Sequence, residues 1–318
     1  MIGLVTDSNA QMPAELVERF GVEVVPLTVT VDGVAYAEGV DLDADEFYDR
    51  LRAGAPQVAT SQPSPGRFAA AYDAVATRGA EAILSVHIGS AISGTINSAR
   101  LAAASAPVPV HIVDTATASF AVACCVWEAA EALGAGAGLE EAAAAARAVS
   151  ATVGNVFVVR GLELARAGGR LADDADALLA IPVLTLTGGA MRTVGEVADA
   201  AEAATVMAAT VRSWATKGAS DDPGVNGPRR LRVGVAVADA ETLPVVESLE
   251  EVLRAAPEVA ELVRYRVGPS VGVHTGPGTV GAMYYPVGPK PSPGSSAGDH
   301  GSDPPGGSSS SPTDSSEG

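Results

Sequence analysis

Short apolar segments alternate with helix-forming segments through the first half of the chain, and this alternation restricts the fold more than any other feature. Strands are predicted at Ile2–Thr6, Glu81–Ile88 and Val108–Val113, with helices between them. Strands that alternate with helices are typical of a mainly parallel sheet with helices packed on its faces. The sequence therefore predicts an α/β fold with a mainly parallel sheet in its N-terminal part.

Composition divides the chain into three parts. We expect an N-terminal α/β domain over residues 1–151, a C-terminal α/β domain over residues 152–286 and a disordered tail over residues 287–318. From Gly288 onward, 23 of the 31 remaining residues are Gly, Pro or Ser, and such a segment cannot build a hydrophobic core. In the second part, strand, helix and strand patterns recur, which predicts another α/β unit.

Four segments that bear on function have predicted conformations of their own. Val58–Pro65 is predicted to be an extended loop, because its two prolines disfavour helical backbone in the residues before them. Helices are predicted at Ser93–Ala104 and Glu196–Trp214, where strong helix formers dominate. Ser270–Gly281 is predicted to be a glycine-rich loop that carries His274.

Small and polar residues follow the predicted strands of the first domain. Gly89–Thr95 joins a strand to a helix, and Asp7 and Asp114 also come directly after strands. The free N–H groups of such a turn can bind an anion, although Ser93 could equally cap the helix that follows. Because ligands of open α/β sheets sit at the carboxyl ends of strands, this edge of the sheet is the best candidate site.

Charge and cysteine usage exclude several classes of function. Asp and Glu number 38 against 20 Lys and Arg, which gives a formal net charge of −18, so we expect no nucleic-acid partner. The only cysteines, Cys124 and Cys125, are adjacent, which fits neither a disulfide framework nor a thiolate metal site and is typical of the cytoplasm. The N-terminus is predicted to be a strand rather than a signal peptide. With no long apolar run in the sequence, we expect no stable membrane insertion.

Motifs for cofactors and for catalysis are weak. Gly276–Gly281 matches the GxGxxG pattern, but too few residues follow before Pro286 to form the helix that a dinucleotide site needs. No Walker-type loop and no paired-histidine metal motif occur in the sequence, so we predict no cofactor and no metal. Asp7 could be a phosphoaspartate nucleophile, but a role in capping the next segment is favoured. Ser93 is not in a GxSxG elbow, which gives little support to a serine hydrolase.

Two other residues keep two interpretations each. His274 lies between glycines, where a histidine either contacts a ligand or has a structural role. Arg170 follows two glycines and could bind an anion or cap the end of a helix.

A set of short motifs, in one order along residues 1–285, resembles the DegV family of fatty-acid-binding proteins, which includes the acyl-carrying subunits of bacterial fatty acid kinase. The motifs are Val5-Thr6-Asp7-Ser8, Thr60-Ser61-Gln62-Pro63, Ile92-Ser93-Gly94-Thr95, Val113-Asp114-Thr115, Gly168-Gly169-Arg170-Leu171, Ile181-Pro182-Val183-Leu184 and His274-Thr275-Gly276-Pro277-Gly278. Each motif is weak by itself, whereas the ordered set is specific.

The resemblance implies two α/β domains with one long-chain fatty acid in a tunnel between them. It implies that hydroxyls matching Thr60 and Ser93 hold the carboxylate, with Ser61, Gly94 and His274 beside them. It also implies that an ATP-dependent kinase subunit phosphorylates the bound carboxylate, that Arg170 contacts this partner or a phosphate, and that the binding protein itself is not an enzyme.

One departure from the family pattern concerns the kinase. Family members often carry an Arg-Thr pair near the predicted docking region, whereas the aligned segment Gly195–Ala200 has no arginine and Arg192-Thr193 lies earlier. Two alternative hypotheses remain at this point: an enzyme that acts on a small acyl or phosphoryl substrate, and a regulatory module whose partner responds to lipid.

Overall fold

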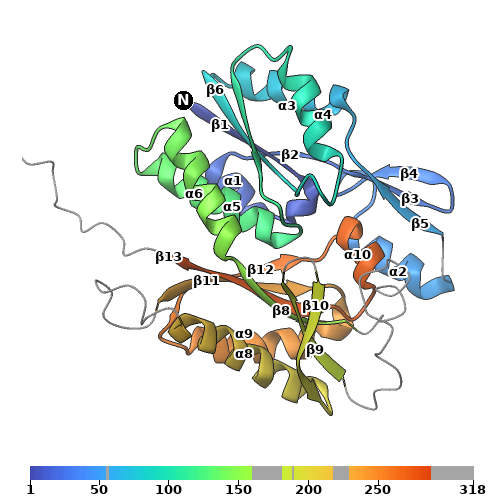
Figure 1. The fold of residues 1–318 in the computed structure, drawn as a ribbon. Coiled ribbons are helices and arrows are strands. Elements are labelled where there is room, and N and C mark those ends of the chain that lie inside the picture. The colour runs from blue at the N-terminus through green and yellow to red at the C-terminus, as the bar shows by residue number, and fades with distance from the viewer. Residues whose placement is uncertain (55–56, 160–180, 188–189, 218–228, 288–318) are drawn as a thin grey trace, which may run out of the picture. The chain divides into compact units, whose positions relative to one another are not determined.

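The fold combines three β-sheets with helices that cover them (Figure 1). The computed structural model describes residues 1–54, 57–159, 181–187, 190–217 and 229–287. The predicted α/β class with a parallel N-terminal sheet is confirmed. Val287, the first residue of the predicted tail, belongs to the last strand, whereas residues 288–318 and Arg170 lie outside the described residues. The predicted boundary between the two domains stays a prediction.

Four parallel strands form the N-terminal sheet, in the order β2-β1-β6-β7. Their bounds are Ile2–Asp7 for β1, Glu23–Val25 for β2, Ala82–His87 for β6 and Val110–Asp114 for β7. Five of the six residues of β6 are buried, as expected for a parallel strand covered on both faces. From β1 the chain builds outward to β2 on one side and to β6 on the other. The carboxyl ends of β1 and β6 therefore form a topological switch point.

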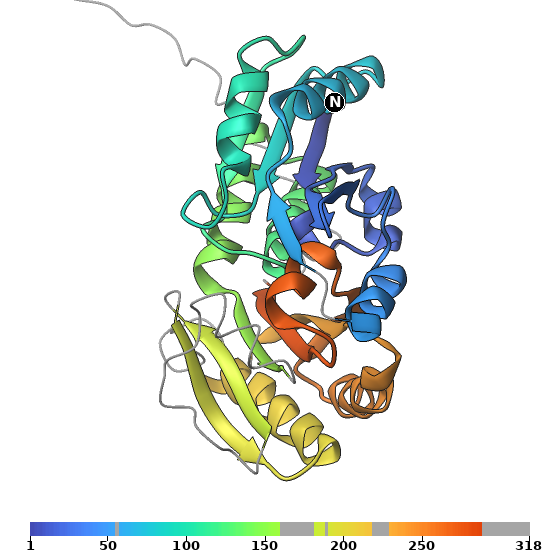
Figure 2. The same ribbon diagram turned by 90° about the vertical axis from the view of Figure 1, so that its right-hand side faces the viewer.

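Helices cover both faces of this sheet (Figures 1 and 2). On one face, Phe68 and Ala99 pack with Val5 and Ile83 of the strands. They belong to α3 (Pro65–Thr77) and α4 (Thr95–Ala103). On the other face lie α1 (Ala14–Phe20), α5 (Phe120–Gly134) and α6 (Leu139–Thr152). The sheet is thus the middle layer of an α/β/α sandwich.

A six-stranded sheet follows in the order β10-β9-β8-β13-β11-β12, in which only β11 and β12 pair in parallel. Its strands are β8 (Gly154–Val158), β9 (Ile181–Thr187), β10 (Ala190–Val197), β11 (Arg230–Val237), β12 (Val259–Arg266) and β13 (Val280–Val287). One face is covered by α8 (Ala200–Lys217) and α9 (Leu243–Arg254), and the 3₁₀ turn η2 (Ala240–Thr242) precedes α9.

The opposite face of this sheet contacts α5, which explains why that helix is so apolar. The rings of Phe120 and Tyr265 stack with 4.3 Å between their centroids and 9° between their planes. Gly234 of β11 makes this contact possible, because a Cβ at that position would lie 2.1 Å from Cε1 of Phe120. Beside the stack, Arg232 of β11 pairs with Glu128 of α5 at 2.7 Å. The two halves of the chain therefore share one core around α5.

A small antiparallel sheet projects from the first half of the chain. Its central strand β3 (Thr28–Val31) pairs with β4 (Val34–Ala37) and with β5 (Val58–Ser61). Next to it lie α2 (Ala44–Gly54) and, from the far end of the chain, α10 (Pro269–Thr275), as both views show (Figures 1 and 2). The 3₁₀ turn η1 (Ser8–Ala10) also contacts α10.

Two predicted loops are partly regular structure, so both predictions were wrong in part. In Val58–Pro65 the first four residues form β5, because the extended backbone finds a partner strand in β3. In Ser270–Gly281 the first six residues belong to α10, which is followed by a short loop and the start of β13. His274 is therefore a helix residue.

The predicted helix Glu196–Trp214 begins later than expected. Glu196 and Val197 pair with β9 at the end of β10. The helix α8 starts at Ala200, after Asp199, whose carboxylate accepts the N–H of Glu202 at 2.9 Å. An acidic cap fixes this start, since it satisfies an N–H group that has no partner within the helix.

Candidate functional site

A cavity of about 580 Å³ opens beside the switch point of the N-terminal sheet. Its lining includes all five residues that the sequence suggested as a ligand site: Thr60, Ser61, Ser93, Gly94 and His274. These residues come from β5, from the segment before α4 and from α10, which are far apart in the sequence. The structure therefore brings them together around one space of the size usual for a small-molecule site.

The lining has a polar part and an apolar part. Hydroxyl and amide side chains come mainly from the first half of the chain and from α10. The apolar part comes from the six-stranded sheet and its neighbours: Val156, Phe157, Leu186, Met191, Val267 and Met283. No Asp, Glu, Lys or Arg is among the described residues that line the cavity. Among these described lining residues, an anionic group would meet neutral donors rather than an arginine or a lysine.

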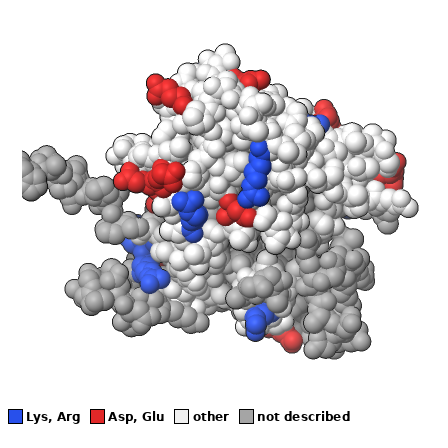
Figure 3. Space-filling model, turned by 45° about the horizontal axis from the view of Figure 1, so that its top comes forward, with Lys and Arg blue, Asp and Glu red and all other residues white. Residues whose placement is uncertain are grey.

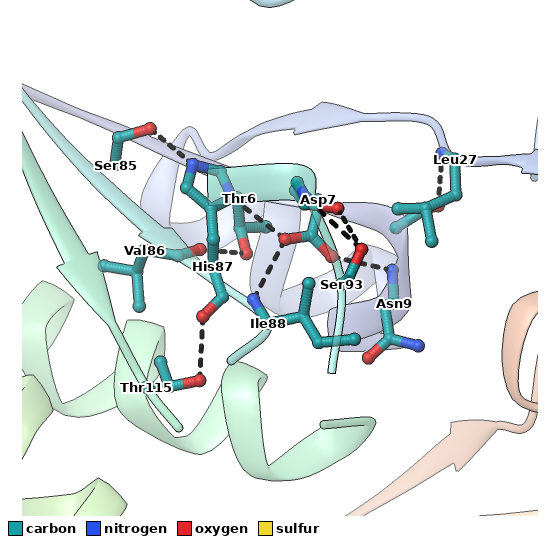
Figure 4. Close-up of polar contacts among 12 residues, drawn as sticks. Thr6, Asp7, Asn9, Leu27, Ser85, Val86, His87, Ile88, Ser93 and Thr115 are labelled. Carbon is teal, nitrogen blue, oxygen red and sulfur yellow. Dashed lines mark hydrogen bonds and ion pairs between the residues drawn. The ribbon is translucent and has the colours of Figure 1, made fainter. Parts of the chain in front are cut away.

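The polar part lies at the carboxyl ends of β1 and β6, as the rule for open α/β sheets predicts. Asn9 follows β1 and Ile88 follows β6, and both line the cavity. Figure 4 shows that Asp7 lies between them, with its carboxylate turned toward both segments. Its Oδ1 accepts the N–H of Asn9 at 3.1 Å, and its Oδ2 accepts the N–H of Ile88 at 3.2 Å. One carboxylate thus fixes the backbone of two segments that line the cavity.

The favoured interpretation of Asp7 as a capping residue is confirmed. It caps η1, it is fully buried, and its Oδ2 lies 2.9 Å from Nδ1 of His87. Asp7 does not line the cavity, so the nucleophile interpretation finds no support in this geometry. His87 is likewise fully buried, as expected of a residue within the sheet.

Ser93 stands at the start of α4 without being its formal cap. The helix begins at Thr95 with Gly94 as the N-cap, two residues later than predicted. The Ser93 hydroxyl lies 2.8 Å from the Thr95 hydroxyl, and it accepts the Thr95 N–H at 3.3 Å. Ser93 is thus fixed by the first helical residue and also lines the cavity, so the two interpretations of this serine are compatible.

Asp114, at the end of β7, also holds the segment between β6 and α4. Its Oδ1 accepts N–H groups from Ser90 at 3.2 Å and from Ala116 at 2.9 Å. Burial raises the pKa of the Asp114 carboxyl, but hydrogen bonds from Ser90 and Ala116 outweigh burial, so the pKa lies below its ordinary value. The carboxylate is therefore held in its charged form, in which it organises the segment before α4.

Thr60 and Ser61 approach from β5, where they pair with Val29 and Thr28 of β3. The next residue, Gln62, packs against Gly94, because a Cβ on Gly94 would lie 3.0 Å from Nε2 of Gln62. This close approach joins the β5 end to the segment before α4. It explains why a glycine is suited to position 94.

His274 and Thr275 reach the cavity from the last turn of α10. This helix packs close to α2 at Gly272, where a Cβ would lie 2.8 Å from both Cε1 of Phe47 and Oη of Tyr48. The helix α10 thus adds polar side chains to a polar part that otherwise comes mainly from the first half of the chain.

Several lining residues were missed by sequence reasoning, among them Asn9, Ser119, Tyr265 and Ser270. Ser119 adopts φ 60° and ψ −152°, a backbone conformation that is rare outside glycine. A serine in the sequence does not predict such a conformation. Asn9 follows Asp7 by two residues, and its local sequence does not mark it as a cavity residue. Asn9 and Ser270 are separated by 261 residues in the sequence, so local sequence patterns could not predict their contact.

Other predicted motifs lack the structural context that their chemistry requires. Gly276–Gly281 is followed by the rest of β13 and not by a helix, so the GxGxxG match has no dinucleotide-binding context. Among the described residues, no group of three or more His, Cys, Asp or Glu side chains is arranged to hold a metal ion. Within that same part of the chain, no helix has both the length and the apolarity to cross a bilayer.

The molecular face in Figure 3 carries its acidic and basic side chains singly or in small groups, with wide uncharged areas between them. The formal charge of −18 is therefore not gathered into one patch on this face. A purely electrostatic docking surface would need such a patch.

Comparisons with known proteins agree over the described part of the chain. A family model described as "Uncharacterised protein, DegV family" matches residues 1–287. A DegV domain-containing protein of Streptomyces coelicolor is 35% identical over 287 residues, which cover 89% of this chain and 97% of that protein. A DegV domain-containing protein of Deinococcus radiodurans is 33% identical over 90% of this chain and 99% of its own length.

Solved structures are similar over the same range. One described as "Fatty Acid Binding of a DegV family Protein from Thermus thermophilus" has a TM-score of 0.77 and 34% identity, and the match covers 90% of this chain and 99% of that chain. A second is described as DegV, a fatty acid binding protein from Bacillus subtilis. It has a TM-score of 0.73 and 26% identity over 89% of this chain and 98% of that chain.

Proposed function

This chain belongs to the DegV family, and we propose that it binds one long-chain fatty acid in the cavity beside the switch point without turning it over. The carboxylate is held by the hydroxyls of Thr60 and Ser93, with Ser61, Gly94 and His274 around it. The acyl chain extends along the apolar part of the lining, in a tunnel between the two proposed domains.

One observation carries this proposal: hydroxyls of Thr60 and Ser93 and an apolar wall line the same cavity, from which Asp, Glu, Lys and Arg side chains are absent among the described residues. Neutral donors suit a carboxylate that must stay reactive, because a buried carboxylate without partners costs several kcal/mol, whereas a tight ion pair would quench it. Fatty acid binding by the similar proteins from Thermus thermophilus and Bacillus subtilis supports the same ligand class.

The acyl chain supplies most of the binding energy. Each methylene that leaves water contributes about 0.8 kcal/mol, so even half of a sixteen-carbon chain, buried against Val156, Phe157 and Met283, contributes about 6 kcal/mol. The head-group contacts then need to supply orientation more than affinity. Loss of one hydroxyl should weaken binding by about 1 kcal/mol, or about fivefold.

A partner kinase is the second part of the proposal. An ATP-dependent subunit would phosphorylate the bound carboxylate, and access to that carboxylate is supported by the exposure of Ser61 and Ile92 at the cavity. Arg192-Thr193, in β10, is the nearest counterpart of the Arg-Thr pair that DegV proteins often carry. Arg170, proposed to contact this partner or a phosphate, lies outside the described residues.

The test begins with the wild-type chain, purified from cells fed with long-chain fatty acid and examined by native mass spectrometry. We expect one bound fatty acid for each chain, released by organic solvent. Thr60→Ala and Ser93→Ala should lower the occupancy, whereas the control Thr77→Ala should not, because the Thr77 hydroxyl bonds to its own helix at Asp73. Only apo protein after feeding would overturn the proposal.

Two further assays separate the alternatives. Hydrolysis of simple esters or phosphate esters by the wild-type chain, abolished in Ser93→Ala, would overturn the non-enzymatic role. With a bacterial fatty acid kinase subunit and ATP, we expect an acyl-phosphate to form from the bound ligand. If none forms with a kinase that is active on its own partner, the second part of the proposal fails while lipid binding stands.

A further inference from the structure

The first turn of α10 is held by side chains that come from the opposite end of the chain. Glu38, directly after β4, accepts the N–H of Ser270 through Oε1 at 2.7 Å. Gln11, just after η1, accepts the N–H of Gly268 and lies 3.4 Å from the Ser270 hydroxyl. Asn9 also lies 3.4 Å from that hydroxyl. Three side chains from the N-terminal segments therefore converge on residues 268–270.

Glu38 is the most unusual member of this group because its carboxylate is buried. Only 5% of the residue is exposed. Its second oxygen accepts the Ser8 hydroxyl at 2.5 Å, and Ser8 in turn accepts the N–H of Leu27 at 2.9 Å. Burial raises the pKa of Glu38 above its ordinary value, although hydrogen bonds from Ser8 and Ser270 act in the opposite direction. A carboxylate in such a place is costly unless its donors are well arranged, so the donors must be held firmly.

The position of Ser270 determines the position of His274. The two residues are four apart in a seven-residue helix, so they lie on the same face, one turn from each other. Both line the cavity. On its other side α10 is seated against α2, where Gly272 leaves room for nothing larger than hydrogen beside Phe47 and Tyr48. A helix fixed at its first turn and at its middle presents its last turn at a defined place.

We propose that Glu38 is a positioning residue of the ligand site: by holding the first turn of α10, it sets where His274 stands across the cavity from Thr60 and Ser93. Glu38 itself does not line the cavity. It acts through the first turn of α10, and this inference rests on the proposed function. A carboxylate serves here better than an amide, because hydrogen bonds to a charged group are stronger and both of its oxygens accept.

Palmitate binding to the full chain tests this proposal through a double-mutant cycle. Glu38→Ala should weaken palmitate binding about tenfold, which corresponds to the loss of one charge-assisted hydrogen bond. Glu38→Gln, which keeps the shape, should lose less. In a His274→Ala background, Glu38→Ala should change affinity less than twofold, because the residue that it positions is gone. In a Ser93→Ala background, the tenfold loss should persist.

The matched control is Asp41→Asn. Asp41 lies three residues after Glu38 and is exposed. Its Oδ2 accepts the N–H of Ala37 at 3.1 Å rather than an N–H of α10. This variant should bind palmitate like the wild type. A merely structural role of Glu38 would lower affinity equally in the His274→Ala and Ser93→Ala backgrounds, and that result would overturn the proposal.

The outcomes also separate this inference from the proposed function. Wild-type chain that binds no palmitate would overturn both. If the wild type, Glu38→Gln and Glu38→Ala all bind palmitate with equal affinity, only the inference about Glu38 is overturned. If Glu38→Ala does not fold, the same cycle is measured with Glu38→Gln, and an equal loss in both backgrounds is again the contradicting result.

Discussion

Ser119 has a backbone conformation that residues other than glycine avoid. We therefore predict that glycine stabilises the fold at this position relative to alanine, the reverse of the usual order. Its φ of 60° and ψ of −152° fall in a region that is occupied almost only by glycine. The surroundings enforce it, because the Ser119 N–H donates to Oδ1 of Asn9 at 2.8 Å while its carbonyl accepts the N–H of Val122 at the start of α5. Ser119→Gly should therefore relieve strain.

The magnitude follows from a comparison of two variants. Both Ser119→Gly and Ser119→Ala remove the hydroxyl, so any effect of losing the hydroxyl cancels between them. The strain of a side chain in this region is about 2 kcal/mol, and only glycine escapes it. The extra flexibility of glycine in the unfolded chain costs about 0.7 kcal/mol. Ser119→Gly should thus be more stable than Ser119→Ala by about 1 kcal/mol.

Urea denaturation followed by circular dichroism measures this difference, and thermal unfolding should show a midpoint about 2 °C higher for the glycine variant. At an ordinary position the order is reversed, since glycine is usually less stable than alanine. Ala135→Gly supplies that comparison, because Ala135 has φ −84° and ψ 0° at the end of α5. If Ser119→Gly were the less stable variant, the reasoning from backbone strain would be refuted.

Three further predictions concern the core and the site. Tyr48→Phe should raise the free energy of unfolding, measured by urea denaturation, by about 1 kcal/mol. The buried Tyr48 hydroxyl has no hydrogen-bond partner among the described residues. Phe120→Ala should lower it by about 4 kcal/mol, because it removes a fully buried ring that stacks on Tyr265. Asp114→Asn should be less stable than wild type at pH 7, and this difference should shrink as the pH falls below 3.8. The lowered pKa of Asp114 gives stability above its ordinary pKa of 3.8, which is lost as the pH falls through the lowered value.

The alternation of strands and helices was enough to predict the parallel sheet and the edge at which the cavity lies. That inference works because strand order and crossover direction limit where the carboxyl ends can be. Whether Ser93 serves as a cap or as part of a ligand site could not be decided from the residues. The structure shows that it contacts Thr95 and also lines the cavity, so the question had no single answer.

The helix α10 shows why some of the site was not predictable. It contains Gly272 and is followed directly by Gly276. Because glycine disfavours helix by about 1 kcal/mol, the local sequence favours a loop. Contacts from distant residues override that preference: Glu38 accepts an N–H of its first turn, and the close packing of Phe47 requires a glycine. The resemblance to a family could suggest His274, but local propensity could not place it on a helix.

The buried side chains behind the cavity show how the same residue types can serve structure instead of chemistry. Asp7, His87 and Ser85 form a hydrogen-bonded chain, with 2.9 Å from Asp7 to His87 and 2.6 Å from His87 to Ser85, in the order of a hydrolytic triad (Figure 4). All three are fully buried, and the Ser85 hydroxyl is also 3.0 Å from that of Tyr72. No substrate atom can approach such a serine. These hydrogen bonds instead fix the Asp7 carboxylate. That carboxylate holds the backbone of two segments that line the cavity. The backbone of Asn9 and Ile88 at the cavity is thus placed by buried polar side chains that do not themselves line it.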